Sequence, residues 1–224
     1  MSFRVVILSA SGNNLRACVA AICNNEPGIH LSDIIVVKDG AYHGAQAQLP
    51  LLTWVEGAKP FQFSRNANIG MRAAGDADVI LCCDDAILQT PGGFTKMERA
   101  GRYVGLTSAS VRGVVANDNQ KVDSKFTHGH MREEYVHLCF ICVLIPNRTR
   151  RLVGDMDERF TGYGYEDNDY SQRVRKEHGT LWVFSDCVVE HESQPSVWRT
   201  DRDITPLLEH NRKLYLDKWG QGSL

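Results

Sequence analysis

The sequence has no apolar run long enough to cross a bilayer. A membrane-spanning helix needs about 20 consecutive apolar residues, whereas the longest apolar stretches, such as Tyr135–Pro146, are much shorter. The first residues, Met1–Ala10, also lack the long apolar region of a signal peptide. We therefore expect a cytoplasmic protein.

An excess of either charge is also missing. The 224 residues include 25 Lys and Arg against 27 Asp and Glu, which gives a net charge of −2. The chain therefore has no general attraction for nucleic acid or anionic lipid, and any phosphate must be bound locally. With 43% hydrophobic and 23% charged residues, it is neither disordered nor fibrous and can bury one substantial core.

The cysteines do not indicate a disulfide framework. They are seven, an odd number, and most of them lie inside apolar runs, which predicts reduced, buried thiols. Cys139 and Cys142 have C-x-x-C spacing, but the apolar residues between them favour a buried strand over a redox or zinc pair.

What the sequence does contain is an alternation of strand and helix patterns. The apolar, β-rich runs Arg4–Leu8, Ile34–Val37 and Val79–Cys83 predict strands buried in a parallel sheet. Helical spacing follows the first run over Leu15–Ile22, and a second helix is expected with Ser64 as its N-cap. This order favours an open α/β sheet with crossover helices.

The second half of the chain is richer in strands. We expect strands at Tyr103–Val115, Tyr135–Pro146 and Leu181–Val189, a helix at about Asn168–His178, and a helical tail. No repeat or linker marks a second domain, so the chain is expected to form a single one. The polar segment Gly113–Arg132 is the best candidate for a mobile loop over a site.

Asp84 and Asp85 come directly after the expected strand Val79–Cys83. This strand would end at the carboxyl edge of the sheet, where open α/β sheets bind ligands. Two adjacent carboxylates repel each other unless a cation or a proton compensates, so a divalent ion bound with a diphosphate would explain the pair. A solvated turn explains it as well from these residues alone, because Asp is a common turn residue.

A glycine-rich acidic segment, Gly162–Asp169, leads into the expected helix. Its glycines allow the backbone to approach a ligand closely. A carboxylate at the start of a helix stays ionised and can accept a hydrogen bond from a hydroxyl. The alternative is an ordinary capping cluster of acids.

His191 follows the β-rich run Trp182–Val189. An imidazole that joins carboxylate oxygens is compatible with Mn²⁺ and less typical of Mg²⁺, which prefers oxygen ligands. A lone His at the end of a strand is also commonly a surface residue. The residues alone leave both interpretations open.

Together, these segments resemble the family 2 glycosyltransferases. The resemblance implies the GT-A fold, a single-domain, Rossmann-like, open mixed and mainly parallel sheet flanked by helices. It extends over most of the chain, from the strand, loop and helix of residues 4–22 to Asn211 and Lys218–Gly220. Its other parts are Ile34–Gly40, Ser64–Gly70, the pair Asp84-Asp85 and Asp157–Asp169.

The resemblance implies a nucleotide-sugar-binding half at about residues 1–110 and an acceptor and catalytic half at about residues 111–224. The implied contacts to the nucleotide or its sugar are Ser9, Ser11, Asp39, Arg65, Asn66 and Asp84. In the DxD-type motif Asp85 would bind the metal, with His191 as the late metal ligand.

The family's catalytic acids match the pair Glu166-Asp167. The resemblance implies Asp167 as general base, with Glu166 orienting the acceptor. Tyr163 and Gly164 are expected to contact the substrate. Two departures from the family are the loop Ser9–Asn14, which lacks the usual Pro and aromatic pattern, and Ala86, where many relatives have a third acid.

The expected function is a metal-dependent glycosyltransferase of the hexosyltransferase type with Mn²⁺ as cofactor. A sugar would pass from a nucleoside diphosphate sugar, most commonly a UDP-sugar, to a hydroxyl of a glycan, a lipid-linked intermediate or another acceptor, with inversion. Retention, the acceptor and the oligomeric state stay open. One alternative is a sugar-nucleotide-forming nucleotidyltransferase. Such enzymes usually carry a Gly-rich, basic loop near the first strand, and Ser11–Asn14 has neither the glycines nor the basic residue. The other alternative is a non-catalytic relative that binds a nucleotide sugar or glycan.

Overall fold

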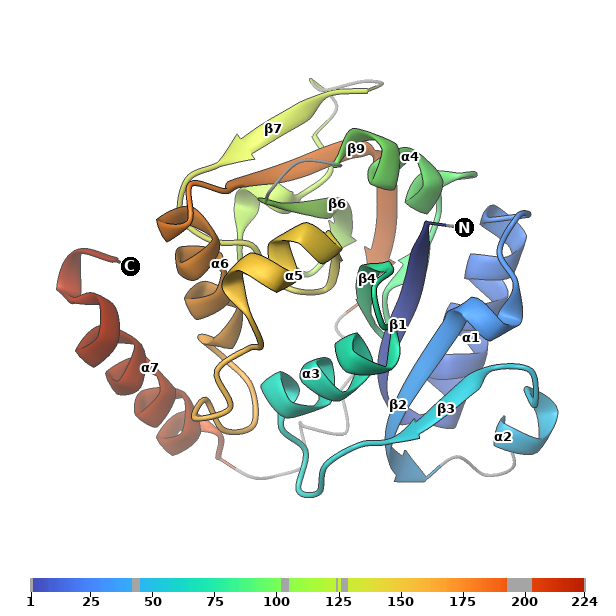
Figure 1. The fold of residues 1–224 in the computed structure, drawn as a ribbon, viewed down its shortest axis with the longest axis horizontal. Coiled ribbons are helices and arrows are strands. Elements are labelled where there is room, and N and C mark those ends of the chain that lie inside the picture. Colours follow the sequence, from blue (N-terminus) through green and yellow to red (C-terminus); the bar gives the residue numbers. More distant parts are fainter. Residues whose placement is uncertain are drawn as a thin grey trace.

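The computed structural model describes residues 2–41, 45–101, 105–123, 125, 129–192 and 203–223. Figure 1 shows a twisted sheet with helices packed around it. Within the described ranges, no helix is both long enough and apolar enough to cross a membrane.

The described residues form a mixed sheet of nine strands. In chain order these are β1 (Phe3–Ser11), β2 (Ile34–Ala41), β3 (Thr53–Glu56), β4 (Asp78–Cys83), β5 (Ile87–Leu88), β6 (Gly105–Gly113), β7 (Met131–Glu134), β8 (Cys142–Ile145) and β9 (Thr180–His191). The order across the sheet is β3-β2-β1-β4-β8-β6-β9-β5, and β7 pairs with β9. The neighbours among β1 to β4 are parallel, as are β6 and β9, whereas β8, β5 and β7 are antiparallel to their partners. The predicted mixed, mainly parallel sheet is confirmed.

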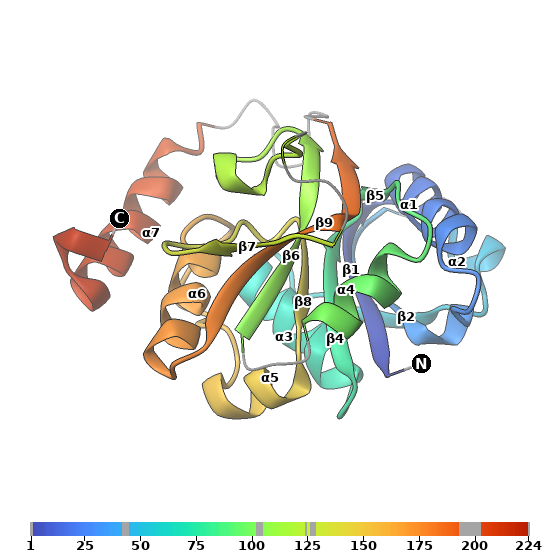
Figure 2. The ribbon, with the colours of Figure 1, turned by 90° about the horizontal axis from the view of Figure 1, so that it is seen from above.

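Helices cover both faces of this sheet (Figure 2). One core lies under α1 (Gly12–Asn25) and α4 (Gly93–Ala100), and the other lies under α3 (Phe63–Ala73) and α6 (Glu166–Lys176). Val5 and Ile7 of β1 point into the first core, and Val6 and Leu8 point into the second. This alternation explains why the central strands appear in the sequence as continuous apolar runs. The shorter or peripheral helices are α2 (Ala45–Gln48), α5 (Asn147–Val153), α7 (Thr205–Trp219), η1 (Leu31–Asp33), η2 (Asp118–Gln120) and η3 (Gln221–Ser223).

The start of α3 differs from the sequence prediction. Its N-cap is Gln62, and Ser64 is buried within the first turn instead of capping the helix. The first N–H, that of Phe63, donates to the carbonyl of Gly162 at 2.7 Å. A distant loop therefore satisfies the helix end, and no hydroxyl cap is needed.

β9 bends in its middle. Ala109 of β6 pairs with Phe184, but the next residue, Ser110, pairs with Val188, so three residues of β9 are without a partner in β6. Beyond the bend, which is visible in Figure 1, β9 pairs with β5. Because β5 follows the Asp84-Asp85 turn directly, this pairing brings the turn to the end of β9.

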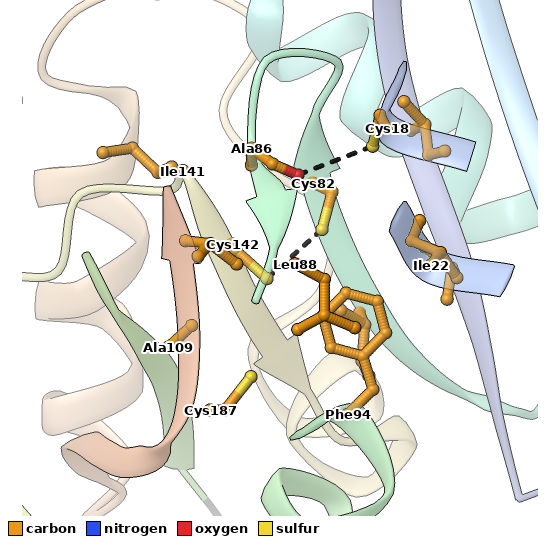
Figure 3. Close-up of a cluster of buried hydrophobic side chains, with 14 of the residues drawn as sticks. Cys18, Ile22, Cys82, Ala86, Leu88, Phe94, Ala109, Ile141, Cys142 and Cys187 are labelled. Carbon is orange, nitrogen blue, oxygen red and sulfur yellow. Dashed lines mark hydrogen bonds between the residues drawn. The ribbon is translucent and has the colours of Figure 1, made fainter. Parts of the chain in front are cut away.

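All seven cysteines carry free thiols, as the sequence predicts. Cys18, Cys82, Cys142 and Cys187 lie in one buried apolar cluster (Figure 3), and Cys82 Sγ is 3.2 Å from Cys142 Sγ. Burial raises the pKa of the Cys18 and Cys187 thiols. These side chains therefore act as small apolar residues of the core.

Gly70 of α3 approaches the sheet so closely that a side chain does not fit. A Cβ at this position would lie 2.2 Å from Val6 Cγ1 and 3.0 Å from Val37 Cγ2. At an exposed helix position, Gly→Ala adds about 1 kcal/mol of stability. Here we expect Gly70→Ala to lower the free energy of unfolding in urea by about 1–3 kcal/mol, because overpacking outweighs that gain.

The control for this substitution is Gly222→Ala, since nothing lies within 4 Å of a Cβ at residue 222. It should change the free energy of unfolding by less than about 0.5 kcal/mol. A Gly70→Ala protein as stable as the wild type would contradict the close packing of α3 on β1.

Candidate functional site

Most of the predicted site residues lie at one edge of the sheet. Strands β1, β2, β4, β6 and β9 end at this edge, and β8, which runs in the opposite direction, begins there. The N–H of Cys83 donates to the carbonyl of Ile141 at 2.9 Å, which ties the end of β4 to the start of β8. Open α/β sheets bind ligands at this edge.

Asp84 fastens the end of β1. Its Oδ2 accepts hydrogen bonds from the Ser9 hydroxyl (2.8 Å) and from the N–H groups of Ala10 (3.0 Å) and Ser11 (3.1 Å). Burial raises the pKa of Asp84 against the lowering effect of these bonds. The structure thus brings Ser9, Ser11 and Asp84 together, and it shows that one oxygen of Asp84 binds the last three residues of β1, which lead directly into α1.

Asp39 lies at the end of β2 with one oxygen unused. Asn66 of α3 donates from Nδ2 to Asp39 Oδ2 at 3.1 Å, and Asn66 Oδ1 accepts from the N–H of Ala58 at 2.7 Å. Asp39 Oδ1 is buried and has no hydrogen-bond partner among the described residues. Burial and the charge of Asp84 raise the pKa of Asp39 to about 6. A buried acceptor without a partner is costly, so this oxygen suits an N–H or O–H group of a ligand.

Asp85 and His191 form the pair that fits a metal ion. Asp85 Oδ2 lies 3.5 Å from His191 Nε2, and His191 Nδ1 lies 2.5 Å from the carbonyl oxygen of Val114. A hydrogen bond from Nδ1 to a carbonyl leaves Nε2 as the nitrogen that can bind a metal. Burial lowers the pKa of His191, but its contacts with Asp85 and Val114 outweigh this effect and raise it.

The pocket beside this pair lacks a balancing positive charge. Its volume is about 400 Å³, and its described lining contains no Lys or Arg. The lining residues are Asn14, Ala17, Asp84, Asp85, Ile87, Glu190 and Glu192. Like charges at this density favour a bound cation. The described part of the chain has no group of three metal-binding side chains, so water and a diphosphate would have to complete the coordination of an ion held by Asp85 and His191.

The glycine-rich segment is held by α7. Gly162 and Gly164 have φ of +62° and +99°, and a Cβ at either position would lie 2.7 Å from a leucine side chain of α7. The buried Asn211 of α7 donates from Nδ2 to the carbonyl groups of Thr161 (2.8 Å), Tyr163 (3.2 Å) and Gly164 (3.0 Å). Glycine is therefore required at both positions for conformation and for space.

Glu166 and Asp167 are the first two residues of α6. Glu166 is buried, and its Oε2 has no hydrogen-bond partner among the described residues. Burial and the charge of Asp167 raise the pKa of Glu166 well above its usual range. Burial also raises the pKa of the partly exposed Asp167, whereas His137 and the N–H of Phe140 lower it. Since Phe140 precedes the residue tied to β4, Asp167 lies at the same edge as Asp84.

Three predicted residues have other contacts in the structure. Arg65 Nε lies 3.2 Å from Glu158 Oε2 in an exposed ion pair, and no described contact joins Arg65 to Asp39. The Tyr163 ring packs against the apolar core beside α6, and Asn211 binds the carbonyl of Gly164. Contacts of Arg65, Tyr163 and Gly164 with a nucleotide or substrate stay predictions.

The polar segment Gly113–Arg132, the candidate for a mobile loop over the site, contains a buried part that its composition does not predict. Gln120 within it is fully buried and bonded to Ser108 and Cys139. Residues 124 and 126–128 of the segment lie outside the described residues, and its role as a loop over the site stays a prediction. At least this part is packed into the fold, because its amides satisfy buried backbone groups. Polar composition alone gives no signal of such burial.

Comparison with solved structures shows that the chain has the GT-A fold. It is similar to GalNAc-T7 solved with UDP, GalNAc and Mn²⁺, with a TM-score of 0.68 and 12% identity over 97% of this chain and 56% of that chain. It is also similar to residues 1–349 of TarS from S. aureus, with a TM-score of 0.62 and 10% identity over 97% of this chain and 72% of the other. A third is the mannosyltransferase PcManGT from Pyrobaculum calidifontis, solved with GDP-Man and Mn²⁺, with a TM-score of 0.65 and 14% identity over 99% and 72%.

These likenesses establish the fold that the chain shares with glycosyltransferases. The chain spans about half the length of the GalNAc-T7 chain it matches. No protein-family model matches the sequence, and no curated protein matches it as a relative. Membership of family 2 is therefore a prediction that rests on the sequence motifs.

The raised pKa of Asp39 predicts that this carboxyl group lowers the free energy of unfolding at high pH. Its pKa is about 6 in the folded chain against 3.8 as the ordinary value, so the folded state binds the proton more tightly than the unfolded state. Stability from this group is therefore greatest at low pH and falls as the pH rises from about 4 to above 6. We expect Asp39→Asn to raise the free energy of unfolding at pH 8 by about 1 kcal/mol, a value discounted for the partial exposure of the carboxylate.

The measurement is urea unfolding of both proteins at pH 8 and pH 4. The advantage of Asp39→Asn should shrink towards zero at pH 4, where the wild-type carboxylate is protonated in the folded state. An advantage equal at both pH values would contradict the raised pKa, and so would a destabilised variant at pH 8.

Proposed function

We propose that the chain is a metal-dependent family 2 glycosyltransferase of the hexosyltransferase type, which transfers a sugar from a nucleoside diphosphate sugar to an acceptor hydroxyl. One observation carries the proposal, the convergence of three kinds of group at one sheet edge. Asp39 has one oxygen without a partner, which suits a nucleoside. Asp85 and His191 form a carboxylate and imidazole pair for a cation, and Glu166 and Asp167 form an acid pair for proton transfer. Residues 1–110 are the proposed donor half and residues 111–224 the proposed acceptor and catalytic half.

The donor is proposed to be a UDP-sugar. The unpaired Oδ1 of Asp39 suits a donor group on the base or ribose, and Asn66 holds that carboxylate in place. The N-terminus of α1 follows the end of β1 that Asp84 binds, and helix N-termini favour phosphate groups. UDP and GDP-Man are bound in two of the similar structures, so both bases belong in the test.

The proposed cofactor is Mn²⁺, held by Asp85 and His191. A carboxylate oxygen and an imidazole nitrogen lie 3.5 Å apart there, and this donor set suits Mn²⁺ better than Mg²⁺. When bound, the ion would neutralise the charge that develops on the departing diphosphate. Mn²⁺ is present in two of the similar structures.

Asp167 is the proposed general base, and Glu166 orients the acceptor. The pKa of Asp167 is raised towards neutral pH, and a general base works most efficiently when its pKa lies near the pH of the reaction. Asp167 removes the proton of the acceptor hydroxyl as that oxygen attacks the sugar from the side opposite the diphosphate, which inverts the anomeric carbon. A glycan, a lipid-linked intermediate or another hydroxyl compound is the proposed class of acceptor, and the cytoplasm is the proposed compartment.

The binding part of this proposal predicts metal-dependent stabilisation by a nucleotide. With UDP at about 100 times its Kd and MnCl₂ present, the melting temperature should rise by about 5–10 °C. Asp85→Asn and His191→Ala should each lose the Mn²⁺-dependent part of this shift. The exposed Asp76→Asn is the control and should keep it. A full Mn²⁺-dependent shift in both site variants would contradict the assigned ligands.

The catalytic part predicts release of nucleoside diphosphate from UDP-sugars or GDP-mannose in the presence of Mn²⁺. Asp167→Asn should lower the rate by about 10²–10⁴-fold, while UDP and Mn²⁺ still stabilise the protein. The exposed Asp217→Asn of α7 is the control with an unchanged rate. Pyrophosphate release from a nucleoside triphosphate and a sugar phosphate would favour the nucleotidyltransferase alternative. Binding without any turnover would favour a non-catalytic relative.

A further inference from the structure

The segment of residues 114–120, here called the strap, joins His191 to the start of β8. At its first residue, the N–H of Val114 donates to the His191 carbonyl at 2.9 Å, and the Val114 carbonyl oxygen lies 2.5 Å from His191 Nδ1. Both the backbone and the imidazole of His191 are thus fixed by one strap residue. The orientation of the proposed metal ligand therefore depends on where the strap lies.

The last residue of the strap, Gln120, holds the backbone of Cys139. Gln120 Nε2 donates to the Cys139 carbonyl at 3.0 Å, and Gln120 Oε1 accepts from the Cys139 N–H at 2.6 Å. The same Nε2 donates to the Ser108 hydroxyl of β6 at 2.7 Å. Gln120 is fully buried. Its amide pairs with both backbone groups of one residue, as a neighbouring strand would.

Asn117 adds a further bond from the middle of the strap. Its Nδ2 donates to the His137 carbonyl at 2.7 Å, and its Oδ1 accepts from the N–H of Asn119 at 2.9 Å, which caps η2. Side chains of the strap therefore bind residues 137–140 at two backbone positions.

Residues 137–140 lie between the strap and the helix of the acid pair. The N–H of Leu138 donates to Ser171 Oγ of α6 at 3.2 Å, and the Phe140 ring packs edge-on against Tyr170 with the ring centres 5.9 Å apart. The imidazole of His137 and the N–H of Phe140 are the groups of this segment that act on Asp167. A shift of this backbone would change the surroundings of Asp167 directly.

We propose that Gln120 is a positioning residue, which acts through residues 137–140 to hold the surroundings of Asp167. The inference rests on the proposed function, in which Asp167 is the general base. A purely structural role of Gln120 predicts a loss of stability without a selective effect on rate. A positioning role predicts a lower kcat with the donor still bound normally, because a displacement of about 1 Å at the reacting groups is enough to cost about 10²-fold in rate.

The test compares Gln120→Met with Asn119→Ala. Met keeps the length of Gln and removes both bonds to Cys139, whereas Asn119 lies in the same turn and its side chain bonds instead to Glu134 at 2.9 Å. Three quantities are measured: hydrogen exchange of the peptide covering residues 137–141, stabilisation by UDP with Mn²⁺, and steady-state release of UDP from the UDP-sugar that the wild type turns over.

For Gln120→Met we expect exchange at residues 137–141 to be faster by about fivefold or more, the factor that one lost net hydrogen bond gives. We expect kcat to fall by about 10- to 100-fold, with the donor KM within about twofold of the wild type and the stabilisation by UDP and Mn²⁺ retained. Asn119→Ala should match the wild type in all three quantities.

A folded Gln120→Met protein with wild-type kcat would overturn the proposal, and so would unchanged exchange at residues 137–141. If Gln120→Met does not fold, Asn117→Ala takes its place, because Asn117 is partly exposed and also binds this backbone. We then expect a lower kcat and an unchanged KM. A wild-type protein that turns over no donor would refute the proposed function, and the exchange data would then decide separately whether Gln120 holds residues 137–140.

Discussion

The pairing of β5 with the bent end of β9 is the constraint on which the site depends. β5 has two residues, and Ile87 within it lies opposite Glu190, the neighbour of His191. A strand this short contributes little stability alone, but it begins just after Asp85. The bend in β9 turns the end of this strand towards the carboxyl edge of β4. Because β8 and β6 lie between β4 and β9 in the sheet, these two features are needed to bring Asp85 next to His191.

Around this constraint the molecule concentrates acids that are costly to keep charged. Burial raises the pKa of Asp39, Asp84 and Glu166, although hydrogen bonds from Ser9, Ala10 and Ser11 lower the pKa of Asp84. Groups with perturbed pKa values gathered at one edge of a sheet are characteristic of functional sites, where stability is given up for chemistry. A cation and the polar groups of a nucleotide would supply the missing partners. The raised pKa values therefore support the proposal that this edge binds a cation together with a nucleotide.

Local patterns were enough to predict most of the sheet and many of the candidate residues. The runs that became β1, β2 and β4 are continuous because both sheet faces are covered, and acids at the ends of such strands point to a ligand edge. What could not be predicted depends on contacts between distant segments. Gly162 supplies the partner for the first N–H of α3, so Ser64 is not the cap. Gln120 is buried although its segment is polar, because it satisfies the backbone of Cys139.

The central claim is that one divalent ion, bound together with a nucleoside diphosphate, is held by Asp85 and His191. The most direct test is anomalous scattering from manganese in a crystal soaked with MnCl₂ and UDP. We expect a single strong peak within coordination distance of the Asp85 carboxylate and His191 Nε2, with diphosphate density beside it. A peak elsewhere, or UDP bound at this edge with no manganese between the two side chains, would contradict it.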